Sequence, residues 1–267
     1  MKARKILSYA FLALILLFVY TPIFVLIIFS FTDATIIGQW QGFSFELYRR
    51  LFTVTRLRNM IVNTVVLALL AATLSTILGT LGALGIFYAK KGWGKTLQGA
   101  SNINVINAEI VIAVSLALIF SMFAFNRTYY SLLIGHVAFC TPFVVLSVMP
   151  KLKQMDPSLY EAALDLGATP AKALFKVILP QILPGVISGF MLALTLSLDD
   201  YIITSFTKPA EFDTISTYVY NAVKNTAKSE LPAFRALAAV IFLVIVIVVI
   251  VLNVRAGRKK ENKVTKK

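Results

Sequence analysis

The chain has 267 residues, of which 58% are hydrophobic and 14% are charged, and its mean hydropathy is +0.82. Soluble domains are about a quarter charged, so this composition excludes intrinsic disorder, argues against an ordinary soluble enzyme and indicates a chain that buries its surface in lipid. The 26 Lys and Arg against 12 Asp and Glu give a net charge of +14, which in so apolar a chain is typical of cytoplasmic loops beside an anionic membrane surface and not of nucleic-acid binding.

Six apolar segments are long enough to cross a bilayer, which takes about 20 residues of helix. They are residues 6–31, 60–89, 103–125, 129–149, 177–199 and 233–254. The sequence therefore predicts an all-α, polytopic membrane protein with six transmembrane helices in one domain, residues 1–267. The first segment follows basic residues, as a secretory signal does, but it exceeds the roughly 7–15 apolar residues of a signal, so we expect a retained anchor.

The distribution of Lys and Arg predicts the orientation. Six spans place both termini on one side, and a cytoplasmic N-terminus puts most of the basic residues inside, including the tail 255–267. We interpret that tail as a solvated end lying along the membrane surface. The exception is a cluster in the first outer loop, Arg49, Arg50, Arg56 and Arg58. Aromatic and leucine residues alternate with these arginines, so we expect an amphipathic helix at the outer interface.

The fourth apolar segment holds the only cysteine, Cys140, and the only histidine, His136. A single cysteine forms no internal disulfide, and one histidine without a cluster of Cys, Asp or Glu provides no metal site. We therefore expect both to be packing residues, with no metal site and no catalytic residue. The sequence also has no Walker-type phosphate loop, so ATP hydrolysis, if it drives transport, must take place in another polypeptide.

The segment 151–176 is too polar to span the membrane, and its helix signals are well defined. Asp156-Pro157 has the pattern of an N-cap followed by proline at the first helical position, and Ser158 with Glu161 offers an alternative capping box. Gly167 marks a helix end, and Thr169 before Pro170 begins a second helix that continues into the fifth span. The sequence predicts a cytoplasmic helix-turn-helix, which taken alone can equally be a well-capped elbow.

Six residues of this region resemble the EAA loop of bacterial ABC-importer permeases: Glu161, Ala162, Ala163, Gly167, Leu179 and Pro180. Val177 stands where that family usually has isoleucine. The resemblance implies the type I ABC-importer permease fold, as in the methionine transporter. It also implies that residues 151–176 form a coupling loop whose helix docks into a groove on an ATP-binding subunit.

Four further motifs extend the resemblance over nearly the whole chain. They are Asn63-Thr64, the stretch 107–111 with Ala108 where proline is common, the stretch 141–145, and the stretch 197–200 followed by Phe206. The first two resemble elements common to the permease family. The last two, with Asp156-Pro157-Ser158 following the stretch 141–145, are close to spermidine/putrescine-type permeases, in particular their shorter C-type subunit. The resemblance implies a multi-pass protein of the bacterial inner membrane, with both termini cytoplasmic. Its implied partners are membrane lipid, a second permease subunit, two ATP-binding subunits that bind ATP-Mg, and an extracytoplasmic polyamine-binding protein.

Glu109, Asp199 and Asp200 are the acids that adjoin the predicted hydrocarbon region. An ionisable group there is costly unless it faces a cavity or a partner. Carboxylates pair with ammonium groups and Tyr201 offers a cation–π surface, so these four residues are the candidate substrate path for a polyamine. Two alternatives stay open: the aspartates simply end the fifth span, and Glu109 caps a helix or pairs with a cytoplasmic lysine.

Other functions remain as alternatives at this point. The same architecture transports sulfate, ferric iron, sugars or phosphonates. A secondary transporter or channel is a different class, in which inverted repeats and helices broken at the midplane are common, and neither is evident in the sequence. A membrane-embedded enzyme would need a catalytic constellation, which the spans lack.

Overall fold

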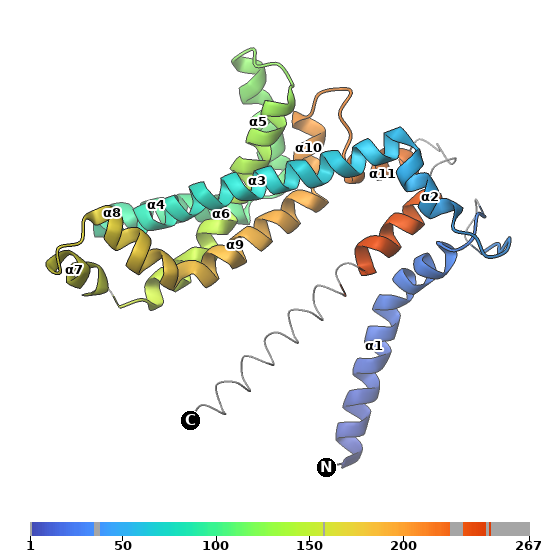
Figure 1. The fold of residues 1–267 in the computed structure, drawn as a ribbon, viewed down its shortest axis with the longest axis horizontal. Helices are drawn as coiled ribbons and strands as arrows, with labels where there is room; N and C mark the ends of the chain where they lie inside the picture. Colours follow the sequence, from blue (N-terminus) through green and yellow to red (C-terminus); the bar gives the residue numbers. More distant parts are fainter. Residues whose placement is uncertain (1, 35–37, 157, 225–231, 244–245, 247–267) are drawn as a thin grey trace. The chain divides into compact units, whose positions relative to one another are not determined.

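The computed structural model describes residues 2–34, 38–156, 158–224, 232–243 and 246 (Figure 1). Within these ranges every regular element is helical, which confirms the predicted all-α fold. The chain divides into two compact units, residues 60–218 and residues 1–59 with 219–267. The assignment of the whole chain to one transmembrane domain stays a prediction.

Four of the described helices are long and apolar enough to cross a membrane. They are Ser8–Phe29, Thr55–Tyr88, Tyr129–Gln154 and Pro170–Asp199. A bent pair of helices makes a fifth span if it is counted as one, and Pro232–Leu243 is a shorter apolar helix. The predicted sixth span is described over residues 233–243 and at residue 246, and its other residues lie outside the described ranges. The total of six spans therefore stays a prediction.

The core of residues 60–218 forms where α6 (Tyr129–Gln154) lies beside α9 (Leu179–Asp199) and against α3 (Thr55–Tyr88). Val144 of α6 is fully buried between two glycines of its neighbours. A Cβ added to Gly79 of α3 would lie 2.6 Å from the Val144 Cβ, and one added to Gly189 of α9 would lie 3.0 Å from Val144 Cγ1. Small residues thus let three spans approach closely.

The predicted third span, residues 103–125, is interrupted near its start. Its first four residues end α4 (Lys91–Ile106), which begins before the predicted span, and α5 (Glu109–Met122) follows, bent by 106° from α4 (Figure 1). The sequence predicts a continuous span over 103–125, and the structure differs because two residues between the helices are extended. The ψ angles of Asn107 and Ala108 are 143° and 137°, which interrupts the helical hydrogen bonds without a proline. α9 is followed by two short helices, α10 (Ile202–Thr207) and α11 (Ile215–Lys224), and α10 packs against α5 and α6.

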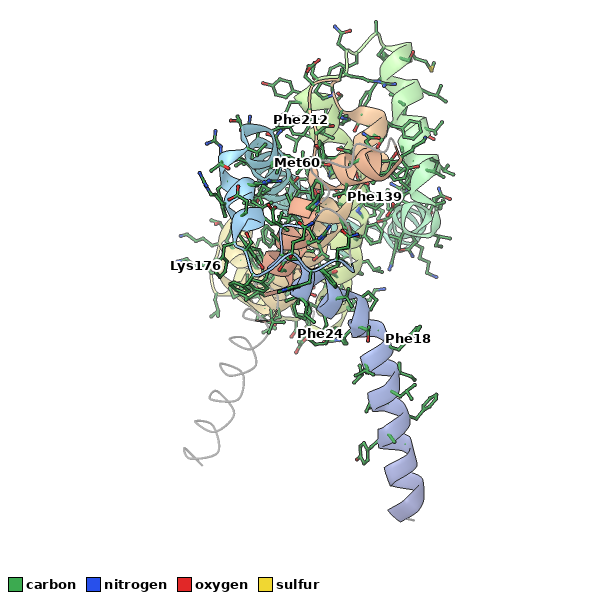
Figure 2. The ribbon with its side chains drawn as sticks, turned by 90° about the vertical axis from the view of Figure 1, so that its right-hand side faces the viewer. Phe18, Phe24, Met60, Phe139, Lys176 and Phe212 are labelled. Atoms are coloured by element: carbon green, nitrogen blue, oxygen red, sulfur yellow. The ribbon has the colours of Figure 1, made fainter. Side chains whose placement is uncertain are left out.

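In the other unit, α1 (Lys2–Phe29) is an apolar helix with little cover. None of its apolar window, Ser8–Phe29, is buried within the described chain, and Figure 2 shows Phe18 and Phe24 projecting from it. The segment predicted as the first outer loop contains α2 (Glu46–Thr53), in which Leu47 and Leu51 are buried, Arg49 is exposed and Arg50 is half-buried. Arg56 and Arg58 of the predicted cluster lie in the first turn of α3. α2 is thus amphipathic, as the sequence predicts.

Candidate functional site

The first helix of the coupling loop, α7 (Ser158–Asp165), is capped by Asp156. Asp156 Oδ1 accepts hydrogen bonds from the Ser158 amide at 3.0 Å and from Ser158 Oγ at 2.8 Å. These bonds lower the pKa of the Asp156 carboxyl, because they favour its charged form. The cap is therefore complete at neutral pH and weakens as the pH falls through that lowered pKa. Of the two predicted caps the structure has the aspartate; Pro157 lies outside the described residues.

Gly167 ends α7 with a φ of +81°. The Gly167 amide donates to the Leu164 carbonyl at 2.9 Å, and the Ala168 amide donates to the Ala163 carbonyl at 3.0 Å. This pair of bonds is a Schellman motif, which satisfies the last carbonyls of a helix and requires a left-handed residue. The helix end predicted at Gly167 is thus confirmed. Nothing in the chain lies within 4 Å of a Cβ built on this glycine, so its surroundings are open.

The second helix of the loop continues into the fifth span through a change of helical type. α8 (Pro170–Ala173) is capped by Thr169, whose Oγ1 accepts from the Lys172 amide at 3.4 Å. It passes into a π-helix, η1 (Leu174–Ile178), and then into α9. Leu179 and Pro180 of the EAA pattern form the first turn of α9, where Leu179 packs against the core and Pro180 is exposed. A π-helical turn is uncommon and occurs frequently at functional sites.

The coupling loop has one face toward the protein and one toward solvent. Ala163 is buried, and the ring of Tyr160 lies 5.4 Å from that of Tyr88 at the end of α3. On the outer side Glu161, Ala162 and Gly167 are exposed. Leu166 and Phe175 are 89% and 63% exposed. Large apolar side chains this open on a polar loop are typical of a surface that another protein covers. The docking role of the six EAA residues stays a prediction.

Three acids from two distant segments come together at the other end of α9. Glu109 is the first residue of α5, which packs against α10. It is half-buried and lies close enough to Asp199 and Asp200 to interact with them electrostatically. Asp199 is exposed and Tyr201 is half-buried. The fold thus brings Glu109 close to Asp199 and Asp200, although about 90 residues separate them in the sequence.

Asp200 differs from its neighbour because its carboxylate turns inward. Oδ1 accepts from the Ile203 amide at 3.0 Å, and Oδ2 accepts from the Thr204 amide and from Thr204 Oγ1, both at 2.7 Å. The carboxylate thus holds the amides of the first turn of α10, and the residue is 6% exposed. Of the predicted path acids, Asp199 is exposed and Glu109 is half-buried, whereas Asp200 is buried and has a structural role that the sequence did not suggest.

His136 of α6 joins this group, and sequence reasoning did not identify it. The ring is fully buried, as expected of a packing residue, but it also bonds two other helices. Nδ1 lies 2.8 Å from Ser197 Oγ, and Nε2 lies 3.0 Å from Thr204 Oγ1 and 3.5 Å from Asp200 Oδ2. The available signal was a histidine in an otherwise apolar span, since a buried polar group needs partners.

The Asn63-Thr64 motif fixes the chain before α11. Asn63 Nδ2 donates to the Asp213 carbonyl at 3.4 Å, and Thr64 Oγ1 accepts from the Ile215 amide at 2.9 Å. Within the loop between α10 and α11, Lys208 Nζ forms an ion pair with the Asp213 carboxylate at 2.6 Å. The motif therefore anchors the segment after α10 to α3.

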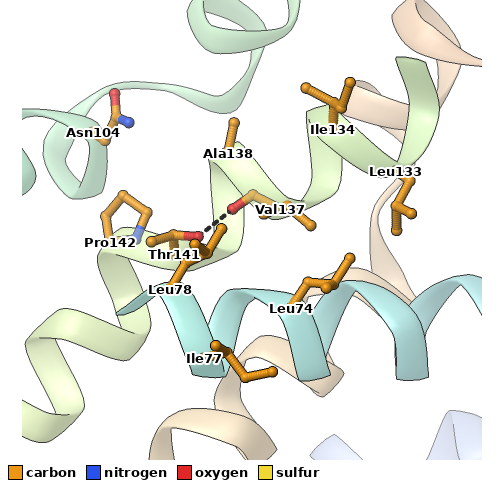
Figure 3. Close-up of a pocket in the computed structure, with 10 residues that line it drawn as sticks. All are labelled: Leu74, Ile77, Leu78, Asn104, Leu133, Ile134, Val137, Ala138, Thr141 and Pro142. Atoms are coloured by element: carbon orange, nitrogen blue, oxygen red, sulfur yellow. Dashed lines mark hydrogen bonds between the residues drawn. The ribbon is translucent and has the colours of Figure 1, made fainter. Parts of the chain in front are cut away.

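A cavity of about 660 Å³ lies between α3, α4 and α6, away from the acids (Figure 3). Its lining is apolar except for Asn104 and Thr141, and Thr141 Oγ1 already donates to the Val137 carbonyl at 2.6 Å. A cation would find no carboxylate there. Among the described residues no group of three or more His, Cys, Asp or Glu is suited to hold a metal ion.

Comparisons with known proteins agree with this architecture. The family model "Binding-protein-dependent transport system inner membrane component" matches residues 125–261. The chain is 33% identical over 243 residues to the spermidine/putrescine transport system permease protein PotC of Haemophilus influenzae, covering 91% of this chain and 95% of that one. It is 30% identical over 254 residues to the putrescine transport system permease protein PotI of Escherichia coli K12, with 91% and 89% covered.

A solved structure shows the same fold. It is that of a bacterial ABC transporter involved in the import of the acidic polysaccharide alginate, with a TM-score of 0.73, 17% identity and 96% of each chain covered. The resemblance to ABC-importer permeases is thereby confirmed, and with it a multi-pass membrane protein that works with a binding protein and is a transport component, not an enzyme. This chain belongs to the family of inner membrane components of binding-protein-dependent transport systems.

Proposed function

We propose that this chain is a permease subunit of an ATP-driven importer of polyamines, passing spermidine or putrescine from an extracytoplasmic binding protein to the cytoplasm. The observation that carries the proposal is its identity of 33% and 30% to permeases named for spermidine and putrescine, each over 91% of this chain.

The acids at the end of α9 suit such a substrate. Spermidine and putrescine carry several ammonium groups, and a carboxylate bound to an ammonium makes a charge-assisted hydrogen bond. Asp199 is exposed and Glu109 is half-buried beside it. The half-buried ring of Tyr201 offers an aromatic face for a cation. These three residues are the proposed substrate contacts.

The coupling loop supports an assembly with separate ATP-binding subunits. The outer side of α7 and the turn after it, with Glu161 and Leu166, is the proposed docking surface, and Gly167 leaves room beside it. We place ATP-Mg on two such subunits and pair this chain with a second permease subunit. Both termini then lie in the cytoplasm.

The test is uptake by the complete transporter, co-expressed with its neighbouring genes and reconstituted in liposomes. We expect uptake of radiolabelled spermidine that needs the binding protein and ATP and that unlabelled putrescine inhibits. Sulfate, ferric iron, a hexose and a phosphonate serve as competitors. Uptake of one of these solutes in labelled form that needs the binding protein and ATP, with no uptake of spermidine or putrescine, would overturn the polyamine assignment and favour that solute on the same architecture.

A further inference from the structure

We propose that His136 is a positioning residue for the substrate path. It binds both arms of the turn between α9 and α10, and so holds Asp199 and Tyr201, which lie within that turn, in a fixed arrangement. The inference rests on the proposed function, because it assigns a purpose to the arrangement of the proposed substrate contacts.

The geometry shows one ring joining three helices. His136 belongs to α6, Ser197 to the last turn of α9 and Thr204 to α10. The ring nitrogens lie 2.8 Å from Ser197 Oγ and 3.0 Å from Thr204 Oγ1. His136 and Thr204 are fully buried, and Ser197 is 3% exposed. Between the two hydroxyls lie six residues, including the exposed Asp199.

The partners of Asp200 fix the direction of each hydrogen bond. Thr204 Oγ1 lies 2.7 Å from Asp200 Oδ2 and gives its single proton to that carboxylate. Thr204 Oγ1 therefore accepts from Nε2–H of His136. The neutral ring then has its lone pair on Nδ1, which accepts from the Ser197 hydroxyl. The protons run in one chain from Ser197 through His136 and Thr204 to Asp200, and every member has a partner.

Close packing leaves this arrangement little freedom. Gly135, next to the histidine, lets α10 approach α6, since a Cβ there would lie 3.1 Å from Ile203 Cγ2 and 3.1 Å from Thr207 Cγ2. Asp200 meanwhile holds the amides of Ile203 and Thr204. The turn is thus tied at both sides to α6, while Asp199 at its start is exposed. A transport site needs its contacts held in position before substrate arrives.

Three substitutions of His136 distinguish its bond to Thr204 from its bond to Ser197. In His136→Gln the amide nitrogen reaches the place of Nε2 and still donates to Thr204. In His136→Asn the shorter side chain retains only an acceptor near Ser197. In His136→Phe the ring volume remains and both bonds are lost. We expect the KM for spermidine to rise about tenfold in His136→Phe, as loss of buried hydrogen bonds implies. His136→Gln should stay within about threefold of wild type, and His136→Asn should lie between them.

The experiment measures labelled spermidine uptake by the reconstituted complex, with Vmax and basal ATPase per assembled transporter. A positioning role raises KM and leaves basal ATPase unchanged. The double variant His136→Phe with Ser197→Ala adds nothing to His136→Phe, because the substitution at Ser197 removes a bond that His136→Phe has already lost. Ser131→Ala is the matched control. Ser131 is a buried residue of α6 that donates to the Thr207 carbonyl, at the far end of α10. An equal rise of KM in the control would show general loosening of α10 and overturn the proposal.

A second measurement needs no substrate. A spin label on Asp199→Cys, in a Cys140→Ala background, reports the motion of the turn. We expect a more mobile label with His136→Phe and an unchanged spectrum with His136→Gln or Ser131→Ala. An immobile label with His136→Phe, or a wild-type KM, overturns the positioning role and leaves polyamine transport standing. A wild-type complex that takes up no polyamine overturns the proposed function, and the label then still decides whether His136 holds the turn.

Discussion

The structure distinguishes the roles of single residues that look equivalent, or have more than one possible role, in the sequence. Gly167 has a positive φ, and nothing in the chain would touch a side chain placed there. A larger residue would therefore be disfavoured either by backbone strain at that φ or by contact with a partner, and these are two separate effects. Asp199 and Asp200 are neighbours in sequence, yet one is exposed and the other caps α10 from inside the protein. We therefore expect the same substitution at these two aspartates to have different effects on transport and stability.

The first prediction concerns Gly167. Gly167→Val places a β-branched residue at a φ of +81°, which costs on the order of 1–2 kcal/mol, whereas Gly167→Asn tolerates that conformation. If the turn alone matters, Asn retains ATP hydrolysis stimulated by binding protein and substrate, and Val loses it at normal membrane levels. We expect both variants to be impaired, Val more than Asn, because a partner must also approach closely. Wild-type stimulation in Gly167→Val would show that the loop only connects two helices.

The second prediction concerns the paired aspartates. Asp199→Asn should reduce spermidine affinity about 5- to 150-fold, the value of a charge-assisted hydrogen bond of about 1–3 kcal/mol, with no loss of thermal stability. Asp200→Asn turns an amide donor toward the Thr204 N–H and O–H, and should lower the melting temperature of the purified protein. Uptake kinetics and thermal unfolding of both variants measure this, with Glu109→Gln as a third neutral substitution. Equal melting temperatures for the two aspartate variants would contradict the buried cap.

Helices and turns with local signals were predictable, and those that depend on distant contacts were not. The end of α7 at Gly167 and the start of α8 at Thr169 follow from residues within one or two turns. The bend before α5 has no local cue, because Ala108 stands where a proline would have announced it. The joining of His136 to Asp200 and Thr204 spans more than 60 residues of chain, and no spacing rule reaches that far.

The third prediction concerns the bend as an element. Ala108 has φ −63° and ψ 137°, and Asn107 before it has φ −67° and ψ 143°. Both conformations suit a proline at position 108. Ala108→Pro should therefore be tolerated and should stabilise the protein by about 0.4–1 kcal/mol, by restricting the unfolded chain. Val114→Pro, inside α5, is the control and should destabilise by about 3 kcal/mol or more. Thermal unfolding in detergent compares them; a lowered melting temperature for Ala108→Pro would refute the extended geometry.

At the scale of the whole molecule, charge and hydropathy predict which side of the membrane each loop occupies. The coupling loop and both termini lie inside in this topology, and the loop between α10 and α11 lies outside. The two loops are separated by α9, whose apolar span ends at Asp199. Composition alone gave the class of protein, and the family comparison then confirmed it.

The fourth prediction tests that topology with single cysteines in a Cys140→Ala background. Asp165 at the end of α7 and Glu211 between α10 and α11 are both exposed, so Asp165→Cys and Glu211→Cys give accessible thiols. A membrane-impermeant maleimide should label Glu211→Cys in intact spheroplasts, and Asp165→Cys only after the membrane is opened. Labelling of Asp165→Cys in intact spheroplasts would reverse the orientation.

The continuity of α8, η1 and α9 has a mechanical consequence. The helix from Pro170 to Asp199 comprises 30 residues, about 45 Å at 1.5 Å per residue. One continuous helix therefore joins the cap at Thr169 to the acids at the opposite end. Because the helix is unbroken, we expect an axial displacement of the loop by a partner to move Asp199 as well. The hydrogen bonds of the π-helical turn at Leu174–Ile178 join residues five apart, one more than in an α-helix. At this turn α8 and α9 can rotate relative to each other about the helix axis, while the length of the helix changes by no more than the rise of one residue.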